Sequence, residues 1–298
     1  MLKMNRVNAK AYYNTLPPRG HQCGDIWRGL PSFGMLGDKP CTGLVITPAC
    51  DLSWQKSDTL TYLPIIPIRA YFSIPAALPL VIEKILSSLQ ATGYELLPNW
   101  SADSYVPPID EELTTLASGL HQYTLAQQRS QKVLKLIERI EAGLSILRII
   151  RSCELGKVDS GTLAKALGSD WPKLKERMIR NSYSSALHFL PADCQNPVFS
   201  GVTEHSVALF RCPITVPVRM LNYAEESSDG AWEKVISAGD IPEAMRVAFR
   251  AVRPIKLLSL KSAFLSDLLT RYSALYNRVG SPDFTDETVE AYGLEVDL

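Results

Sequence analysis

A thiol stands beside a carboxylate at Cys50-Asp51, directly after the β-branched run 43–47 and Pro48. A cysteine at a strand end can act as a nucleophile or metal ligand, provided that a base lies within hydrogen-bond reach. The candidate bases are four histidines that occupy no local catalytic signature: His21, His121, His188 and His205. The alternative is structural, with Cys50 as a small buried side chain and Asp51 in a turn. The residues leave both interpretations open.

A zinc site is the second chemistry to weigh, because four possible ligands fall within residues 21–50: His21, Cys23, Cys41 and Cys50. Structural zinc sites usually show paired knuckles such as Cys-x-x-Cys, which this sequence lacks. We therefore expect buried thiols, no metal and no cofactor. Six cysteines in 298 residues are far too few for a disulfide scaffold, which favours a reducing, cytoplasmic location.

A third signal is the segment 163–174, which is similar to the helix-turn-helix pattern Leu-Ala-x-x-Leu-Gly. The second helix would carry four basic side chains able to approach phosphates: Lys173, Lys175, Arg177 and Arg180. However, Trp171-Pro172 occupies the helix start, where base-reading side chains should project. The alternative is a helical hairpin whose charges form a solvated face. DNA binding is therefore possible but not favoured.

Composition and charge exclude several classes of protein. Lys+Arg and Asp+Glu number 31 each, hydrophobic residues are 46% and charged residues 21%, as in an average soluble domain. A disordered polar chain, a collagen-like chain and a wholly basic nucleic-acid binder are excluded. The most apolar stretch, 63–82, is interrupted by four prolines and Arg69, and residues 1–15 contain no apolar signal-peptide core. We expect no membrane association.

The elements that must position these residues change in character along the chain. Short β-rich runs separated by Gly and Pro predict strands near 24–29, 43–47 and 59–68, paired antiparallel in one small sheet. Apolar residues at spacings of three and four predict an amphipathic helix over 127–150. Further helices are expected at 160–168 and from 170, further strands at 206–210 and 214–218, and closing helices at 241–251 and 257–276.

This order predicts an α+β fold: a small, strongly bent, antiparallel β-barrel-like sheet with a helical insertion and C-terminal helices. We divide the chain into a β-rich domain over 1–105, the helical insertion over 106–190, and strands and helices over 191–298 that close the β-rich domain.

The opening strands also carry a family resemblance. Gly24-Asp25-Ile26-Trp27, the run 43–48 and the run 63–68 together resemble the start of the PemK/MazF-like toxin barrels. That family begins with a Gly-Asp-Ile strand, followed by a Gly-rich or basic loop and an Ala-Leu-Val-Ile-Ser-Pro strand. The resemblance covers residues 20–70 and implies an SH3-like barrel. The Cys50-Asp51 segment resembles one in uncharacterised bacterial proteins, some encoded beside phage-defence genes.

The resemblance implies endoribonuclease chemistry based on a basic residue in the first loop and a hydroxyl after the third strand. Here the loop offers Lys39, and Arg69 replaces the threonine expected after Ile68. Both can supply positive charge, but an arginine cannot give up its proton, and an exposed ammonium is a poor base. The departure favours a binding platform over a nuclease.

The candidate site is therefore Lys39, Cys50, Asp51 and Arg69, with no catalytic residue assigned. The expected function is a non-catalytic interaction or sensor subunit of a bacterial defence or toxin–antitoxin-like system, with a protein partner. The alternatives are an endoribonuclease of the PemK/MazF type and a helix-turn-helix DNA-binding regulator.

Overall fold

The computed structural model describes residues 12–15, 17, 19–54, 56–126, 130–193, 200–238 and 241–276. The strands are β1 (Tyr13–Thr15), β2 (Asp25–Leu30), β3 (Met35–Asp38), β4 (Cys41–Val45), β5 (Thr59–Pro67), β6 (Leu187–Leu190), β7 (Ser206–Leu209), β8 (Ile214–Pro217) and β9 (Ile255–Leu260). The helices are α1 (Ala49–Ser53), α2 (Ile68–Tyr71), α3 (Leu78–Thr92), α4 (Asp110–Ala126), α5 (Gln131–Arg151), α6 (Ser160–Leu167), α7 (Asp170–Ile179), α8 (Val218–Glu226), α9 (Asp229–Ser237), α10 (Glu243–Phe249) and α11 (Ser262–Tyr276).

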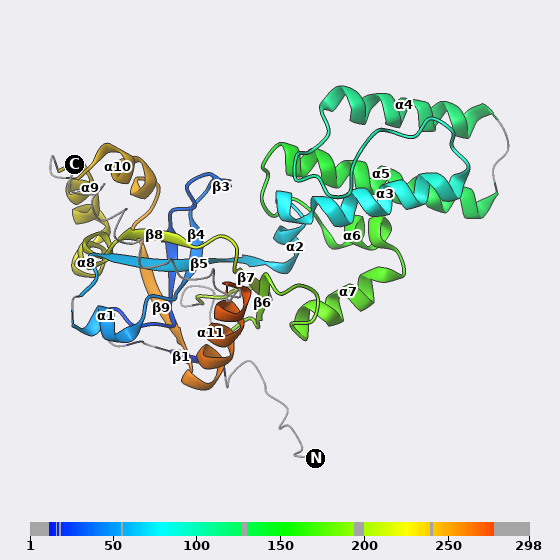
Figure 1. Cartoon of the computed structure of the whole chain (residues 1–298). Helices are drawn as coiled ribbons and strands as arrows, with labels where there is room; N and C mark the ends of the chain where they lie inside the picture. The colour runs from blue at the N-terminus through cyan, green and yellow to red at the C-terminus, as the bar shows by residue number, and fades with distance from the viewer. Residues whose placement is uncertain are drawn as a thin grey trace, which may run out of the picture.

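An antiparallel sheet of eight of these strands forms one half of the molecule (Figure 1). Its order is β1-β9-β2-β4-β5-β7-β6, and β8 pairs with β5 off this path. The first half of β5 pairs with β8 and its second half with β7, so that one long strand serves two neighbours on the same edge. This arrangement curls the sheet into a half-barrel and confirms the expected strongly bent antiparallel sheet.

Both faces of the sheet are buried, because its strands alternate between two apolar cores. Trp27, Val45 and Tyr62 point into the larger core, whereas Ile26 and Leu44 point into the smaller one. Helix α11 covers the smaller core with one apolar side: Phe264, Leu265, Leu268, Leu269 and Tyr272. Helices α8–α10 and α2–α7 share the larger core. The C-terminal helices thus close the sheet, as the sequence predicts.

The helical insertion forms the other half of the molecule in Figure 1. Helix α3 packs along α5, and α5 also contacts α4 and α6. The approach of α3 to α5 is close because Gly143 faces Ile85, where an added Cβ would lie 2.6 Å from Ile85 Cγ1. Among the described residues, no helix combines the length and the apolar character needed to cross a membrane.

Two segments differ from the expected secondary structure. The chain from Leu78 onward, which begins inside the proline-interrupted stretch 63–82 where no helix is expected, forms α3, since Pro79 falls in the first turn of a helix, where its missing N–H costs nothing. Residues 257–260, expected in a helix, belong to β9 and pair with β1 and β2. A short apolar run fits both periodicities, and neighbouring strands decide between them.

A glycine in the centre of the sheet makes room for a buried aromatic ring. A Cβ at Gly43 would lie 2.5 Å from Tyr62 Cδ2 and 2.7 Å from Leu30 Cδ1. Tyr62 is fully buried, and its hydroxyl donates to the carbonyl of Pro31. The pairing of β4 with β5 therefore depends on the missing side chain at residue 43.

We expect Gly43→Ala to lower the free energy of unfolding by about 1–3 kcal/mol, the usual cost of overpacking a core. Urea denaturation measures the effect. Gly230→Ala is the matched control, because Gly230 lies in α9 with no atom within 4 Å of an added Cβ. That variant should be as stable as the wild type or slightly more so, since alanine favours the helix. Equal stability of Gly43→Ala and wild type would contradict this packing argument.

Candidate functional site

Cys50 and Asp51 lie on the short helix α1, with the thiol of Cys50 donating to Asp51 Oδ1 at 3.5 Å. Cys50 is exposed, so the structural interpretation as a buried small side chain does not describe it. None of the four histidines hydrogen-bonds to Cys50 in the part of the chain that the structure describes: His21 contacts Asn222, His188 is buried in β6, and His205 accepts from the Ala192 N–H. The hydrogen-bonding partner of the thiol is thus the carboxylate of Asp51 and not a histidine.

Lys39 and Arg69 lie at the opposite end of the sheet from Cys50-Asp51. Strands β4 and β5 are antiparallel, with Thr42 beside Ile65, so the turn before β4 and the chain after β5 share one end. Helix α1 follows the other end of β4, and five residues of strand separate the two ends by about 16 Å. The structure therefore separates these two pairs of candidate residues (Figure 1).

Each of these two basic side chains has its own surroundings. Arg69 Nη2 forms an ion pair with Glu204 Oε2 at 2.7 Å, and both side chains are about half exposed. Lys39 lines a cavity of about 320 Å³ between the β3–β4 turn and α10, together with Phe33 and Val247. Arg69 does not line that cavity.

The basic residues of the helix-turn-helix alternative are exposed on α7 and at its C-terminal end. Lys175 Nζ lies 5.2 Å from the ring centre of Trp171, and Arg180 Nε is 2.8 Å from Glu176 Oε1. Trp171 itself is buried and packs edge-on against Phe72. Trp171 is therefore not available to contact a base, whereas Asp170, Pro172 and Lys173 of the same helical turn are exposed.

The potential zinc ligands do not gather. Among the described residues, no group of three His, Cys, Asp or Glu side chains could hold a metal ion. Burial raises the pKa of Cys23 to about 11 and that of Cys41 to about 12, so both remain thiols at neutral pH. Their sulfur atoms lie 3.8 Å from the backbone carbonyls of Val45 and Pro31. Cys194 lies outside the described residues.

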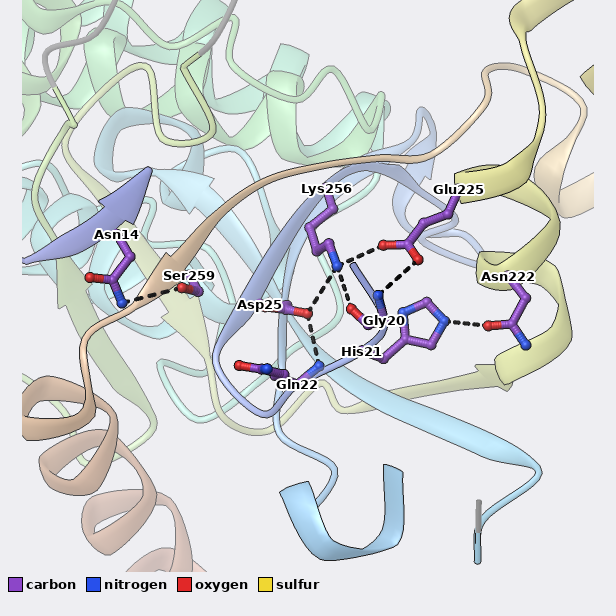
Figure 2. Close-up of polar contacts among 9 residues, drawn as sticks. All are labelled: Asn14, Gly20, His21, Gln22, Asp25, Asn222, Glu225, Lys256 and Ser259. Carbon is purple, nitrogen blue, oxygen red and sulfur yellow. Dashed lines mark hydrogen bonds and ion pairs between the residues drawn. The ribbon is translucent and has the colours of Figure 1, made fainter. Parts of the chain in front are cut away.

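A buried cluster of charged residues joins β9 to β2 and α8 (Figure 2). Lys256 Nζ of β9 lies 2.6 Å from Glu225 Oε1 of α8 and 3.7 Å from Asp25 Oδ2 of β2, and it donates to the carbonyl of Gly20. The side chains of Lys256 and Asp25 are only 6% and 1% exposed. We call Lys256, Asp25, Glu225 and the adjacent His21–Asn222 pair the Lys256 cluster.

Burial sets the electrostatics of the Lys256 cluster. It raises the pKa of Asp25 to about 6, although Lys256 and the Gln22 N–H favour the carboxylate. It also lowers the pKa of His21, so that this ring is neutral at pH 7 and bonds to Asn222 at 2.6 Å. Asp25 Oδ1 has no hydrogen-bond partner among the described residues. Two carboxylates therefore face one ammonium in a poorly solvated place.

A cavity of about 720 Å³ lies beside the Lys256 cluster, lined by His21, Asn222 and the start of α8. Asp25 and Lys256 do not line it, so their charges are not presented to a ligand. The cluster instead holds residues 20–25, α8 and β9 together. We assign it a structural role.

The helical insertion presents a different kind of surface. A cavity of about 1030 Å³ lies between the α3–α4 loop and one side of α4; we call it the α4 groove. Its floor includes Tyr94 and Leu116, which are buried, and its rim includes Leu96, Leu97 and Ile109, which are exposed. Leu96 is 76% exposed, an unusual state for a leucine that has a core available.

Charge in this part of the chain has one sign. Residues 85–126 contain no Lys or Arg but five acidic residues: Glu95, Asp103, Asp110, Glu111 and Glu112. Asp110 and Glu112 serve the fold, since Asp110 Oδ2 pairs with Arg151 Nε at 2.9 Å and Glu112 Oε2 accepts from the Ile109 N–H at 2.9 Å. The other three form no ion pair among the described residues. The residues that line the α4 groove include three acidic side chains and no basic one, and Arg151 pairs with one of these, Asp110.

The sequence analysis missed both the Lys256 cluster and the α4 groove. Asp25 entered the sequence analysis only through the Gly-Asp-Ile-Trp resemblance; its carboxylate accepts from the Gln22 N–H, and its buried partner Lys256 comes from β9. The available signal was a charged residue within each of two largely apolar strands, Asp25 in β2 and Lys256 in β9. For the groove, the signal was the absence of basic residues over 85–126 beside the apolar run near Leu96 and Val106.

Comparisons of the chain with protein-family models, with curated proteins and with solved structures give no match. The functional conclusion below therefore depends on the arrangement of these surfaces and on the sequence motifs.

Because the folded pKa of Asp25 lies above the unfolded value, this group stabilises the fold below about pH 4 and loses that contribution as the pH rises through 6. A rise from 3.8 to about 6 corresponds to about 3 kcal/mol. We expect the stability of wild type relative to Asp25→Asn to fall by about this amount between pH 4 and pH 7, measured by urea unfolding. The exposed Asp103→Asn is the control. A parallel pH profile for wild type and Asp25→Asn would disprove this role.

Proposed function

We propose that the protein is a non-catalytic interaction subunit that binds another protein through the α4 groove. One observation carries the proposal. Of the twelve exposed large apolar side chains among the described residues, six lie within residues 96–125: Leu96, Leu97, Tyr105, Val106, Ile109 and Leu125. Exposed apolar side chains scattered singly are normal, but Leu96, Leu97 and Ile109 line one concave surface, and exposed apolar residues gathered in this way are typical of an interface.

The position of the groove supports this function. It lies on the insertion, away from the curled sheet, so a partner can bind there without disturbing the scaffold (Figure 1). Apolar groups at the centre and polar groups around them match the usual anatomy of a protein interface. Helix α4, one wall of the groove, packs on α5, which packs on α3, so this wall is formed before a partner binds, which reduces the ordering cost of binding.

The sheet supports the non-catalytic part of the proposal. Cys50-Asp51 and the pair Lys39 and Arg69 lie at opposite ends of β4, and Arg69 is engaged by Glu204. Cleavage by attack of an RNA 2′-hydroxyl needs a proton acceptor and charge stabilisation at the same phosphate. These residues lie too far apart to act on one phosphate.

The biological setting in this proposal comes from resemblance. The antiparallel β2, β4 and β5 agree with a degenerate PemK/MazF-like barrel over residues 20–70. The Cys50-Asp51 segment resembles one found in bacterial, partly defence-associated proteins. We propose a cytoplasmic subunit of a bacterial defence or toxin–antitoxin-like system, in which the barrel has become a scaffold and the insertion binds the partner.

The non-catalytic assignment is tested with single-stranded RNA. We expect purified protein to leave the RNA intact over hours on a denaturing gel, because Cys50-Asp51 and the cations Lys39 and Arg69 lie at opposite ends of β4. Lys39→Ala and Arg69→Ala should then match the wild type. An RNA-cleaving activity that co-purifies with the protein and is lost in either variant would establish a nuclease and refute the non-catalytic assignment.

The interaction assignment is tested by comparing two variants of the tagged full-length protein expressed in its source cells. Leu96→Ser with Ile109→Ser changes the α4 groove, whereas Ile179→Ser with Val252→Ser changes exposed apolar residues elsewhere. We expect a partner to co-purify with wild type and control, and its recovery to fall at least about tenfold with the groove variant, as for interface hot spots. Equal recovery from both variants would refute the proposal.

A further inference from the structure

We infer that the segment which occupies the α4 groove is a basic amphipathic helix of the partner protein. This inference rests on the proposed function and adds the chemistry of the partner. It draws on three observations: the sign of the charge around the groove, the length of its α4 wall and the apolar character of its rim.

The charge around the groove selects a basic partner. Over residues 85–126 the net formal charge is −5, without a single Lys or Arg. Glu111 lines the groove and Glu95 lies between two residues that line it, Tyr94 and Leu96; both carboxylates are exposed and form no ion pair among the described residues. A basic segment would pair with them, whereas an acidic peptide, a nucleic acid or an anionic lipid would be repelled. At the rim such pairs mainly increase the association rate and the specificity.

The wall of the groove has the length of a short helix. From α4 it takes Glu111, Thr115, Ser118 and Gln122, at spacings of four, three and four residues, which is one continuous side of a helix. The eleven rises of 1.5 Å from Glu111 to Gln122 make a wall of about 17 Å. A helix of about three turns spans that length and places side chains at i, i+4 and i+7 along it, as in other helix-in-groove complexes.

The floor and the opposite wall fit the apolar side of such a helix. Leu96, Leu97 and Trp100 of the α3–α4 loop face the polar side of α4 across the groove. Gly119 brings α4 close to Tyr94, since a Cβ there would lie 2.1 Å from Tyr94 Oη. A partner helix would therefore set its apolar side chains on Tyr94, Leu97 and Ile109 and its Lys or Arg side chains toward the acidic residues around the groove.

The experiment selects binders from a displayed library of 16-residue peptides randomised at every position, with the immobilised full-length protein as bait. Peptides that also bind Leu96→Ser with Ile109→Ser are removed. We expect the remaining sequences to carry a net positive charge and apolar residues at i, i+4 and i+7. Enrichment of groove-dependent sequences that are neutral or acidic would overturn the inference while leaving the proposed function intact.

A second measurement tests the charge directly. The dissociation constant of the best peptide, measured by fluorescence anisotropy, should rise at least about threefold for Glu95→Gln with Glu111→Gln at low salt. The difference should shrink as salt screens the pairs. Glu226→Gln, which removes an exposed charge from α8, is the control and should bind like wild type. An unchanged dissociation constant for Glu95→Gln with Glu111→Gln would refute the inference of a basic partner.

The remaining outcomes are distinguishable. If no peptide depends on the groove, the proposed function falls together with the inference. If sedimentation velocity shows self-association that the groove variant loses, the occupant is a second copy of this chain, and the assignment to a partner protein is wrong. We expect a sedimentation coefficient that does not change with concentration.

Discussion

The buried ammonium of Lys256 is the interaction on which the sheet depends. A charge out of water is tolerated only when other groups replace its solvation, and here Glu225, Asp25 and the Gly20 carbonyl do so. These partners come from α8, β2 and the segment before β2, so the contacts form only when the last strand has returned to the first ones. Trp27, whose ring centre lies 5.7 Å from Lys256 Nζ, adds a favourable aromatic face. One residue thus links the register of β9 to the entry of β2.

The pairing of β5 with β7 explains how the sheet can accommodate a large helical insertion. Strands β5 and β7 are neighbours in the sheet, although helices α2–α7 lie between them in the sequence. A long excursion between paired strands adds little closure entropy once the strands are fixed. The insertion has its own packing of α3, α4, α5 and α6 and contacts the sheet through α2 and α7. It is therefore free to evolve a binding surface without changing the scaffold.

Sequence patterns predicted the parts of this fold that depend on local chemistry. The helix over α5 and the antiparallel strands β2, β4 and β5 follow from apolar periodicity and turn residues, and the structure confirms them. Helix α3 was missed because proline was taken as a break, although Pro79 stands where a helix accepts it. Strand β9 was missed because Leu257, Leu258 and Leu260 suit a helix equally well until β1 and β2 flank them. Both errors concern segments whose conformation is decided by distant neighbours.

Charge is distributed unevenly along the chain. The chain is neutral overall, yet residues 85–126 carry −5, so the rest carries the balancing +5. An exposed apolar groove is an aggregation hazard in a neutral setting, because any apolar surface can bind it. Acidic side chains around the α4 groove reduce this hazard: two grooves that approach each other bring like charges together, and contacts with acidic surfaces are disfavoured in the same way. The same charges attract a basic segment from a distance. In the proposed interface, selectivity would come from repulsion as much as from attraction, so that Leu96 can stand in water and the interface can remain specific.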